Sequence, residues 1–420
     1  MNRLVLYPAH MSYEPILYIG CLKSLLLNTY YKGVKPMNQL EATTGASIRG
    51  IGTAWPAHRI EQKDVSARLA QALEHEPDAR RWAKRIFNQC GVETRYTCEP
   101  NLLEPVDSCR YLPFTNADEV PTTSERMGKY KAAAVPLGLE AAGQAIQDAD
   151  VTSSELTHLI TVSCTGQFLP GLDVRLIQQL ELSPQINRIP LVFQGCAAGL
   201  KAIQLANSIV TADQKATVLI VCVELCTLHF QPSAKRDDLY AASFFGDGAS
   251  ACVIGASGTD RNECFRLGRG HSTLLPDCAE EMIWEVGNTG FDLYLSPQIP
   301  KLLGLHLGPE VERLLEGSGL PEIWAIHPGG RGIVDAVQKL YQLTDEQVSY
   351  SRNILRDYGN LSSVTILFVL QAIREDYRQK EEHSSGIALA FGPGLTAELL
   401  PFTYIPAPIA NRTPVNHGIQ

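Results

Sequence analysis

The sequence predicts an α/β protein built from two successive halves whose strands lie inside the molecule. Apolar, β-branched runs recur along the chain and are nearly continuous, which is typical of strands covered by helices on both faces. Segments with helical spacing separate these runs, and a second, similar series begins near residue 320. Two series of this kind indicate a layered sandwich with an internal pseudo-repeat.

The first half contains the longer series of predicted elements. Its first helix, residues 131–148, is rich in alanine and helical in spacing despite Pro136. The strands are predicted at residues 156–163, 189–193, 217–225 and 249–254. A further helix begins just after Cys196. Because the strand runs are apolar throughout rather than alternating, we expect each strand to be buried on both faces.

The second half repeats this order in a shorter form. A strand is predicted at 323–326, helices at about 333–343 and 364–374, and a strand at 387–390. We place the halves at residues 47–265 and 266–408. Residues 1–46 are expected to form a weakly ordered extension, and residues 409–420 a tail, because chain ends often lack fixed structure.

Composition and charge narrow the class of protein. The chain has 420 residues, of which 45% are hydrophobic and 19% charged, enough material for a large core. A net charge of −9 argues against nucleic acid as the main partner. No run approaches the ~20 apolar residues of a membrane span. The apolar segment 16–27 is interrupted by Lys23 and lacks a clear cleavage site, so no secretory signal is predicted.

The eleven cysteines lie at irregular spacings, without a CxxC pair or a zinc-ligand pattern. We therefore expect free thiols in a reducing cytosol, hence a cytoplasmic protein, and no metal site. The glycine-rich segments 244–249 and 391–396 have neither phosphate-loop nor dinucleotide spacing. No flavin or nicotinamide site is indicated.

Cys196 is the first candidate for a reactive residue. It lies in the small-residue turn QGCAAG (194–199), between a predicted strand and a helix. Small neighbours let a thiol project into a cavity, as a nucleophile elbow does for serine, and a helix N-terminus favours thiolate. A structural cysteine at a tight junction is the alternative. The helix has one apolar face, formed by Ala198, Ala202, Leu205, Ala206 and Ile209.

His327 and Asn360 are the candidate partners of this thiol. His327 ends a strand and precedes Pro-Gly-Gly, a rigid turn facing a cleft, where imidazole can take the thiol proton. A satisfied core histidine is the competing interpretation. Asn360 precedes a helix, where asparagine is usually a cap. Its amide could instead donate to the enolate that forms when a malonyl thioester loses CO₂, which a carboxylate would repel.

Five segments together resemble the chalcone synthase-like type III polyketide synthases. In order they are QGCAAG, FFGDGAS, IHPGG, YGNLSS and FGPGLTAE, and the resemblance runs from about residue 47 to residue 402. It implies the thiolase fold, a five-layered αβαβα sandwich of two pseudo-repeated halves, working as a homodimer. It also implies an acyltransferase that uses malonyl-CoA and an acyl-CoA starter as substrates, without a cofactor.

The resemblance assigns roles residue by residue. Cys196 would carry the starter and the growing chain, with His327 and Asn360 completing the triad. The expected substrate-binding residues include Phe245, Phe291, Ser362 and the loop residues Phe391, Gly392, Pro393 and Gly394. The basic residues expected to bind the phosphates of CoA are Arg81, Lys84 and Arg85. A solvated helix face is the alternative for this basic cluster.

Other positions resemble the bacterial alkylresorcinol and alkylpyrone synthases more than the plant enzymes. Cys164 replaces a cavity threonine, and Leu169 matches the residue that reaches across the dimer into the partner's cavity. Cys226 and His229 would line the cavity where the plant enzymes have threonines, and Ala390 replaces a glycine. These departures favour a fatty acyl starter and a resorcinol, pyrone or related aromatic product.

Three other functions remain open from the sequence. An initiating β-ketoacyl-carrier-protein synthase shares the Cys-His-Asn triad but resembles the chain less at IHPGG, GNLSS and FGPGLTAE. A non-catalytic acyl-CoA-binding subunit is the alternative of another class, although all three triad positions are filled. Water could also attack an acyl-thiol intermediate, which would give a hydrolase. An acyl carrier protein remains a possible starter donor.

Overall fold

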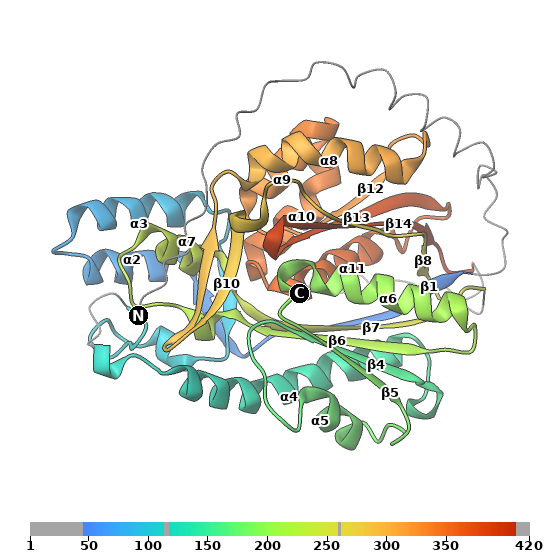
Figure 1. The fold of residues 1–420 in the computed structure, drawn as a ribbon, viewed down its shortest axis with the longest axis horizontal. Coiled ribbons are helices and arrows are strands. Elements are labelled where there is room, and N and C mark those ends of the chain that lie inside the picture. The colour runs from blue at the N-terminus through green and yellow to red at the C-terminus, as the bar shows by residue number, and fades with distance from the viewer. Residues whose placement is uncertain (1–44, 113–116, 259–261, 409–420) are drawn as a thin grey trace, which may run out of the picture. The chain divides into compact units, whose positions relative to one another are not determined.

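The computed structural model describes residues 45–112, 117–258 and 262–408 (Figure 1). The predicted extension, residues 1–46, lies outside the described residues except for its last two, and β1 begins at Ala46. The predicted tail, residues 409–420, lies entirely outside them.

One large mixed sheet runs through this part of the chain, in the order β12-β13-β14-β8-β1-β7-β6-β4-β5, with β9 beside β14. Two two-stranded sheets, β2–β3 and β10–β11, lie apart from it. The strands are β1 (Ala46–Ala54), β2 (His58–Glu61), β3 (Thr94–Thr97), β4 (His158–Ser163), β5 (Asn187–Val192), β6 (Val218–Leu225), β7 (Asp247–Ala256), β8 (Cys264–Leu267), β9 (His271–Leu274), β10 (Met282–Gly287), β11 (Gly290–Leu295), β12 (Ile323–Ile326), β13 (Ser384–Gly392) and β14 (Thr396–Ile405).

The internal pseudo-repeat is visible in the strand directions. In the first half β4 and β6 are parallel, β6 and β7 antiparallel, and β7 and β1 antiparallel. In the second half β12 and β13 are parallel, β13 and β14 antiparallel, and β14 and β8 antiparallel. The two series join where β1 and β8 pair antiparallel, Ser47 opposite Arg266. Since β8 contains residues 265 and 266, it spans the predicted division between the halves.

Helices complete the five layers (Figure 1). α4 and α5 cover the outer face of the first-half strands, α6 and α11 lie between the two sets of strands, and α8, α9 and α10 cover the second-half strands. The helices are α2 (Gln62–Ala72), α3 (Pro77–Gln89), α4 (Thr123–Asp148), α5 (Leu172–Gln179), α6 (Ala198–Ala212), α7 (Arg236–Phe244), α8 (Ile299–Leu315), α9 (Arg331–Tyr341), α10 (Asp345–Tyr358) and α11 (Thr365–Tyr377). Within the described ranges, no helix is both long and apolar enough to cross a membrane.

Local sequence explains where the long helices begin. α4 starts earlier than predicted because Thr122 and Glu125 form a capping box, in which each side chain accepts from the other residue's backbone N–H. Thr344 and Gln347 do the same for α10. Pro136 is tolerated inside α4.

The prediction that every strand is buried on both faces is wrong for β5. Strands β6 and β7 are buried along almost their whole length, as predicted. β5 is the last strand of the sheet, and four of its six residues are exposed. Val192 and the adjacent Phe193 are 47% and 39% exposed. A continuous apolar run predicts a buried strand only if other elements cover both faces of that strand. β5 lies at the edge of the sheet, and its outer edge is not covered by any described residue.

Candidate active site

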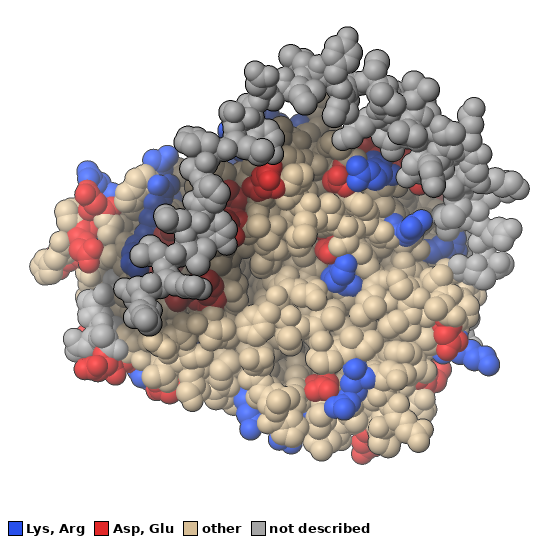
Figure 2. Space-filling view, viewed as in Figure 1, with Lys and Arg blue, Asp and Glu red and all other residues tan. Residues whose placement is uncertain are grey.

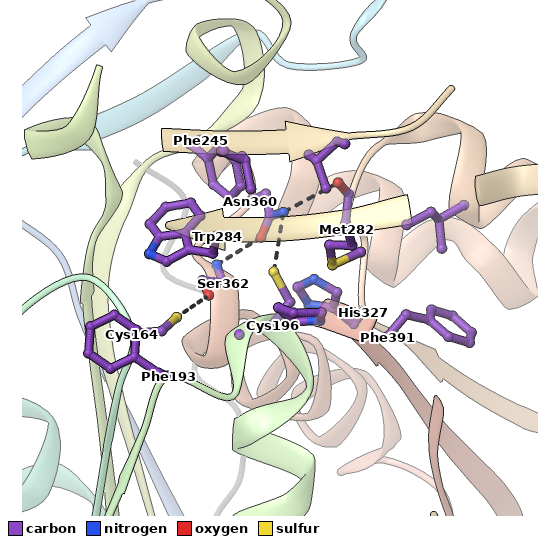
Figure 3. A pocket seen from close by; sticks show the side chains of 16 residues that line it. Cys164, Phe193, Cys196, Phe245, Met282, Trp284, His327, Asn360, Ser362 and Phe391 are labelled. Atoms are coloured by element: carbon purple, nitrogen blue, oxygen red, sulfur yellow. Dashed lines mark hydrogen bonds between the residues drawn. The ribbon is translucent and has the colours of Figure 1, made fainter. Parts of the chain in front are cut away.

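A tight turn presents Cys196 at the start of the central helix α6. β5 ends at Val192, and a short 3₁₀ turn, Gly195–Ala197, leads into α6. Gly195 has a φ of +64°, and a Cβ there would lie 2.1 Å from Cδ of Pro393. Only glycine suits this position, because both the backbone angle and the proline ring exclude a side chain. The thiol is thereby held at the pocket (Figure 3).

Replacing Gly195 with alanine is expected to damage both the fold and the site. The strained backbone angle alone costs about 1–3 kcal/mol of unfolding free energy, and the contact with Pro393 adds to that cost. Thermal unfolding of the purified variant measures the loss. Gly128→Ala is the matched control, since Gly128 lies inside α4 with nothing within 4 Å of an added Cβ, and it should stabilise by about 0.5–1 kcal/mol. Equal melting temperatures of Gly195→Ala and the unmodified protein would contradict this account.

His327 is a buried imidazole in the wall of the pocket. It follows β12 directly, and its backbone N–H donates to Leu389 O at 2.8 Å, which fixes the end of the strand against β13. The side chain is fully buried, and neither ring nitrogen has a partner among the described residues. Since the imidazole also lines the pocket beside Cys196 (Figure 3), its nitrogens are available to a reacting group. It is not a satisfied core histidine.

Asn360 combines a capping role with an amide aimed at the sulfur. Its Oδ1 accepts from the N–H of Ser362 at 2.7 Å, as a cap does. Nδ2 donates to Gly329 O at 3.3 Å and lies 4.0 Å from Sγ of Cys196. The carbonyl end is thus occupied by the protein and the N–H end faces the pocket, so that the donor is in place for negative charge that develops near the thiol.

Burial controls the charge states of Cys196 and His327. Desolvation raises the pKa of the Cys196 thiol to about 11, a rise that hydrogen bonds with Ser362 and Asn360 reduce. Desolvation also lowers the pKa of His327 to about 3. Each ion alone is therefore disfavoured at neutral pH, whereas thiolate and imidazolium side by side compensate one another. The environment favours transfer of the proton from sulfur to imidazole over separate ionisation of the two groups.

The pocket around the triad is mostly apolar and encloses about 660 Å³ of space between atoms, its mouth included. It brings together eight of the predicted residues: Cys196, His327, Asn360, Phe245, Cys164, Ser362, Phe391 and Pro393. Ser362 contacts the second thiol, with 3.2 Å between its Oγ and Sγ of Cys164 (Figure 3). Gly392 and Gly394 do not line the pocket, and between them Pro393 packs against Gly195.

Three predicted residues lie around a second, adjoining cavity: Phe291, Cys226 and His229. Phe245, Trp284 and Leu293 form walls of both cavities. The hydrogen bonds of His229 are satisfied, since Nε2 lies 2.6 Å from Thr165 O and Nδ1 accepts from the N–H of Phe291 at 3.0 Å. Its ring stacks on Phe291 with centroids 4.1 Å apart, and burial lowers its pKa to about 3. His229 is therefore a neutral imidazole at ordinary pH, and its hydrogen bond and ring stacking hold Phe291 in place.

The remaining predicted residues lie outside both cavities. Leu169 is 92% exposed, beside the groove along the β5 edge. The three basic residues Arg81, Lys84 and Arg85 are exposed on α3. Arg81 pairs with Asp78, and Arg85 lies 5.8 Å from the ring centroid of Trp82.

One group of pocket residues, and one group of buried residues in contact with the pocket wall, were not identified from the sequence. The β10–β11 hairpin contributes Met282 and Trp284 from one strand and Leu293 and Leu295 from the other. Their period of two is visible in the letters MIWEV and FDLYL, and it is the signal that could have found them. The second group is a buried carboxylate network, for which the sequence carries no local signal.

The network is centred on Glu224, at the end of β6. Its carboxylate accepts from the backbone N–H of Cys164 and of Thr165, both at 3.1 Å, and from Oγ1 of Thr165 at 2.7 Å. Ser363 Oγ donates at 2.5 Å and Cys164 Sγ at 3.1 Å. Burial raises the pKa of Glu224. The network ties the end of β4 to the segment that follows Asn360, and so fixes the floor of the pocket.

Comparisons with known proteins agree with this geometry. The family model of the N-terminal domain of chalcone and stilbene synthases matches residues 35–258, and that of their C-terminal domain matches residues 266–406. The alpha-pyrone synthesis polyketide synthase-like Pks18 of Mycobacterium tuberculosis is 30% identical over 382 residues, which are 89% of this chain and 95% of that protein. The same protein from Mycobacterium bovis matches equally.

Two solved structures are similar over most of the chain. PKS-I from the brown alga Ectocarpus siliculosus superposes with a TM-score of 0.80 at 27% identity, covering 87% of this chain and 100% of that one. The C-terminal type III polyketide synthase domain of Steely1 from Dictyostelium superposes with a TM-score of 0.78 at 25% identity, covering 85% and 99%. The chain therefore belongs to the chalcone and stilbene synthase family and is a type III polyketide synthase with the thiolase fold.

Proposed function

We propose that this synthase loads a fatty acyl group from CoA onto Cys196, extends it with malonyl-CoA and closes the product to a pyrone or resorcinol. The observation that carries the proposal is a thiol, an imidazole and a carboxamide N–H around one apolar pocket. The second cavity, which shares Phe245, Trp284 and Leu293 with the first, offers further apolar surface for an alkyl chain. Pks18, to which the chain is similar, is named for alpha-pyrone synthesis, in agreement with the proposed product class.

In the proposed loading step, Cys196 sulfur attacks the thioester carbonyl while His327 takes the thiol proton. The carbonyl oxygen gains negative charge, which the Asn360 N–H stabilises. When the tetrahedral intermediate collapses, CoA leaves as a thiol with the proton that His327 returns. An acyl thioester on Cys196 remains.

In the proposed extension step, malonyl-CoA loses CO₂ and the electron pair of the broken C–C bond forms an enolate. His327 and Asn360 donate hydrogen bonds to the enolate oxygen, and the described residues of the pocket wall include no carboxylate to repel it. The enolate carbon attacks the acyl carbonyl on Cys196 and expels the thiolate. The chain gains two carbons and is held again as a CoA thioester, ready to reload.

Asn360→Asp tests the enolate donor. The substitution replaces Nδ2–H by a carboxylate oxygen of similar size, so malonyl-CoA decarboxylation is expected to fall about 100-fold or more. Acetyl-CoA formation from malonyl-CoA without a starter measures this step separately from loading. Asn353→Asp, the same change at an exposed position of α10, is the control. Decarboxylation at the normal rate in Asn360→Asp would rule out the proposed role.

CoA binding is proposed for the basic surface of α3, through Arg81, Lys84 and Arg85. Lys and Arg side chains gather there beside acidic ones (Figure 2), and guanidinium groups suit phosphates. The protein needs no metal or organic cofactor in this proposal, because thiol and imidazole chemistry suffices. A CoA thioester is the proposed starter donor, with acyl carrier protein as the alternative to be compared in the assay.

A homodimer in the cytoplasm is the proposed working state. Exposed apolar side chains at the β5 edge, Leu169, Val192 and Phe193, and a surface with few charges over β4 to β7 (Figure 2) support a symmetric interface there. In such a dimer Leu169 would reach the partner's cavity. Sedimentation of the purified protein at several concentrations tests it, and a monomer throughout would contradict it.

The product assay decides between functions. The purified protein is incubated with malonyl-CoA and with acyl-CoA or acyl-carrier-protein starters of increasing chain length. The products are identified by mass spectrometry. Pyrones or resorcinols from long-chain acyl-CoA are expected. A single β-ketoacyl product on carrier protein would indicate an initiating β-ketoacyl synthase, and free acid alone a hydrolase. Substrates that are bound but not consumed would indicate a non-catalytic subunit.

A further inference from the structure

A third cavity adjoins the second one and shares Phe230, Gln231 and Asp238 with it. It holds about 490 Å³ of space between atoms when the open solvent at its mouth is counted, and the centre of a water molecule can reach about 30 Å³ of it. Most of its wall is apolar and comes from α2, α7 and the segment between β3 and α4, including Val65, Leu69, Leu102, Leu112, Leu239 and Ala242. Arg95 on β3 is the fully buried charged residue of this wall.

The guanidinium of Arg95 is only partly satisfied by the protein. Nη1 donates to Phe245 O at 2.8 Å, and Cζ lies 5.5 Å from the ring centroid of Phe230. Nε and Nη2 are buried and have no hydrogen-bond partner among the described residues. Buried charged donors are normally paired, because leaving them unpaired costs free energy. The two unpaired donors therefore indicate that a ligand, or ordered water, binds there.

The positions of the unpaired donors are specific. Nε–H and the Nη2–H on the same side form one edge of the guanidinium plane, with two parallel donors that match both oxygens of a carboxylate. Arg126 provides the contrast within this chain. It is also fully buried, but Nε donates to Pro121 O and Nη1 to Leu228 O and Phe230 O. In Arg126 only Nη2 is left without a partner among the described residues, whereas in Arg95 both donors of the Nε–Nη2 edge are unpaired and the residue lines a cavity.

The charges around the cavity favour an anion. Burial lowers the pKa of Arg95 to about 10, so the group stays cationic at neutral pH. The nearby Asp247 is held by other donors, the N–H of Cys98 at 2.9 Å and the N–H and Oγ1 of Thr227 at 2.8 and 2.7 Å. Asp238 and Arg68 also line the cavity. The cavity wall thus carries two guanidinium groups, of Arg68 and Arg95, and one carboxylate, of Asp238. Burial raises the pKa of Asp238.

We propose that the third cavity binds a small monocarboxylic acid, its carboxylate held bidentately by Nε and Nη2 of Arg95 and its alkyl group against the apolar wall. Arg95 also holds Phe245, a wall residue of the catalytic pocket, through Nη1. The neighbours of Phe245 bracket Asn360, since Asn360 N donates to Phe244 O at 2.7 Å and Gly246 N to Asn360 O at 3.1 Å. A ligand on Arg95 would therefore be linked to Asn360 through the short segment around Phe245.

Binding is tested with the full chain after Cys196 has been alkylated with iodoacetamide, so that the catalytic pocket is blocked. Titration with ¹³C-carboxyl-labelled butyrate, followed by NMR, is expected to show saturable binding. Arg95→Lys keeps the charge but loses the paired edge, and should weaken binding about tenfold or more. Ala242→Leu fills the cavity and should weaken it while leaving Arg95 in place. Arg80→Lys, an exposed position on α3, is the control and should bind normally.

Four outcomes would overturn the proposal. They are an absence of saturable binding, equal affinity of Arg95→Lys and the unmodified protein, bicarbonate binding as tightly as butyrate, and crystals grown with 2-bromobutyrate that show only water beside Arg95. If Arg95→Lys fails to fold, Ala242→Leu decides alone, because retained butyrate affinity with the cavity filled would place the binding elsewhere. Acetate and decanoate extend the series. The tightest binding should fall at the chain length that the apolar wall accommodates.

Discussion

Replacing Cys196 with alanine is expected to abolish acyl loading and product formation. Removing a covalent nucleophile costs on the order of 10⁶ in rate, and here the change also leaves His327 without a proton to accept. Intact-protein mass spectrometry after incubation with acyl-CoA measures the adduct directly. The unmodified protein should gain the mass of one acyl group, and Cys196→Ala should gain none.

Two further variants make the result specific to this thiol. Cys252→Ala removes a thiol buried in β7 and should load normally. Cys164 is the other thiol of the pocket wall, and burial raises its pKa strongly, which disfavours a thiolate. An acyl adduct that persists in Cys196→Ala and disappears only in the double variant with Cys164→Ala would transfer the role of nucleophile to Cys164.

Replacing His327 with alanine is expected to slow the alkylation of Cys196 at neutral pH, because the pKa of the thiol is raised. Without a base beside it, Cys196 must ionise alone, and a pKa of about 11 leaves only about 10⁻⁴ of it as thiolate at pH 7. The reactive form is the thiolate. Alkylation by iodoacetamide should therefore be slow at pH 7 and rise about tenfold for each pH unit up to pH 10. Mass spectrometry of the peptide that contains Cys196 follows the reaction.

The unmodified protein should differ from His327→Ala both in the rate of alkylation and in how steeply that rate rises with pH. Because His327 accepts the proton as the thiol reacts, alkylation at pH 7 should be about 10² to 10⁴ times faster than in the variant and should depend less on pH. His75→Ala, at an exposed position after α2, is the control. Identical pH profiles for His327→Ala and the unmodified protein would show that the imidazole does not assist the thiol.

The candidate triad could be predicted from the sequence because each member lies at the end of a regular element. Cys196 follows a strand and starts a helix, His327 ends a strand before Pro-Gly-Gly, and Asn360 follows α10. Apolar runs mark such strands, and glycine marks such turns, so local pattern is enough to place them. The order of the five motifs then gave the family, which the comparisons confirm.

Burial patterns were less predictable, because they depend on which elements cover which. The predicted apolar face of α6 contains Leu205 and Ile209, which are only partly buried, whereas Ile203 and Val210 are fully buried. α6 lies in the middle layer with strands on both sides (Figure 1), so no single face describes it. In β5 the apolar run predicts burial, but most of the strand is exposed because it lies at the edge of the sheet.

The sequence by itself determined the α/β fold and the family, and it predicted a reactive thiol with two partners that the structure brings to one pocket. Only the tertiary structure decided how Glu224 and Arg95 are used. Both are charged residues within strands, and a linear pattern carries no record of what surrounds a buried charge. Folding encloses Glu224 with donors from the residues just after β4 and from the segment after Asn360, and leaves the Nε–Nη2 edge of Arg95 without a partner among the described residues. The cost of burying a charge depends on contacts between residues far apart in the chain, and these exist only once the layers have assembled.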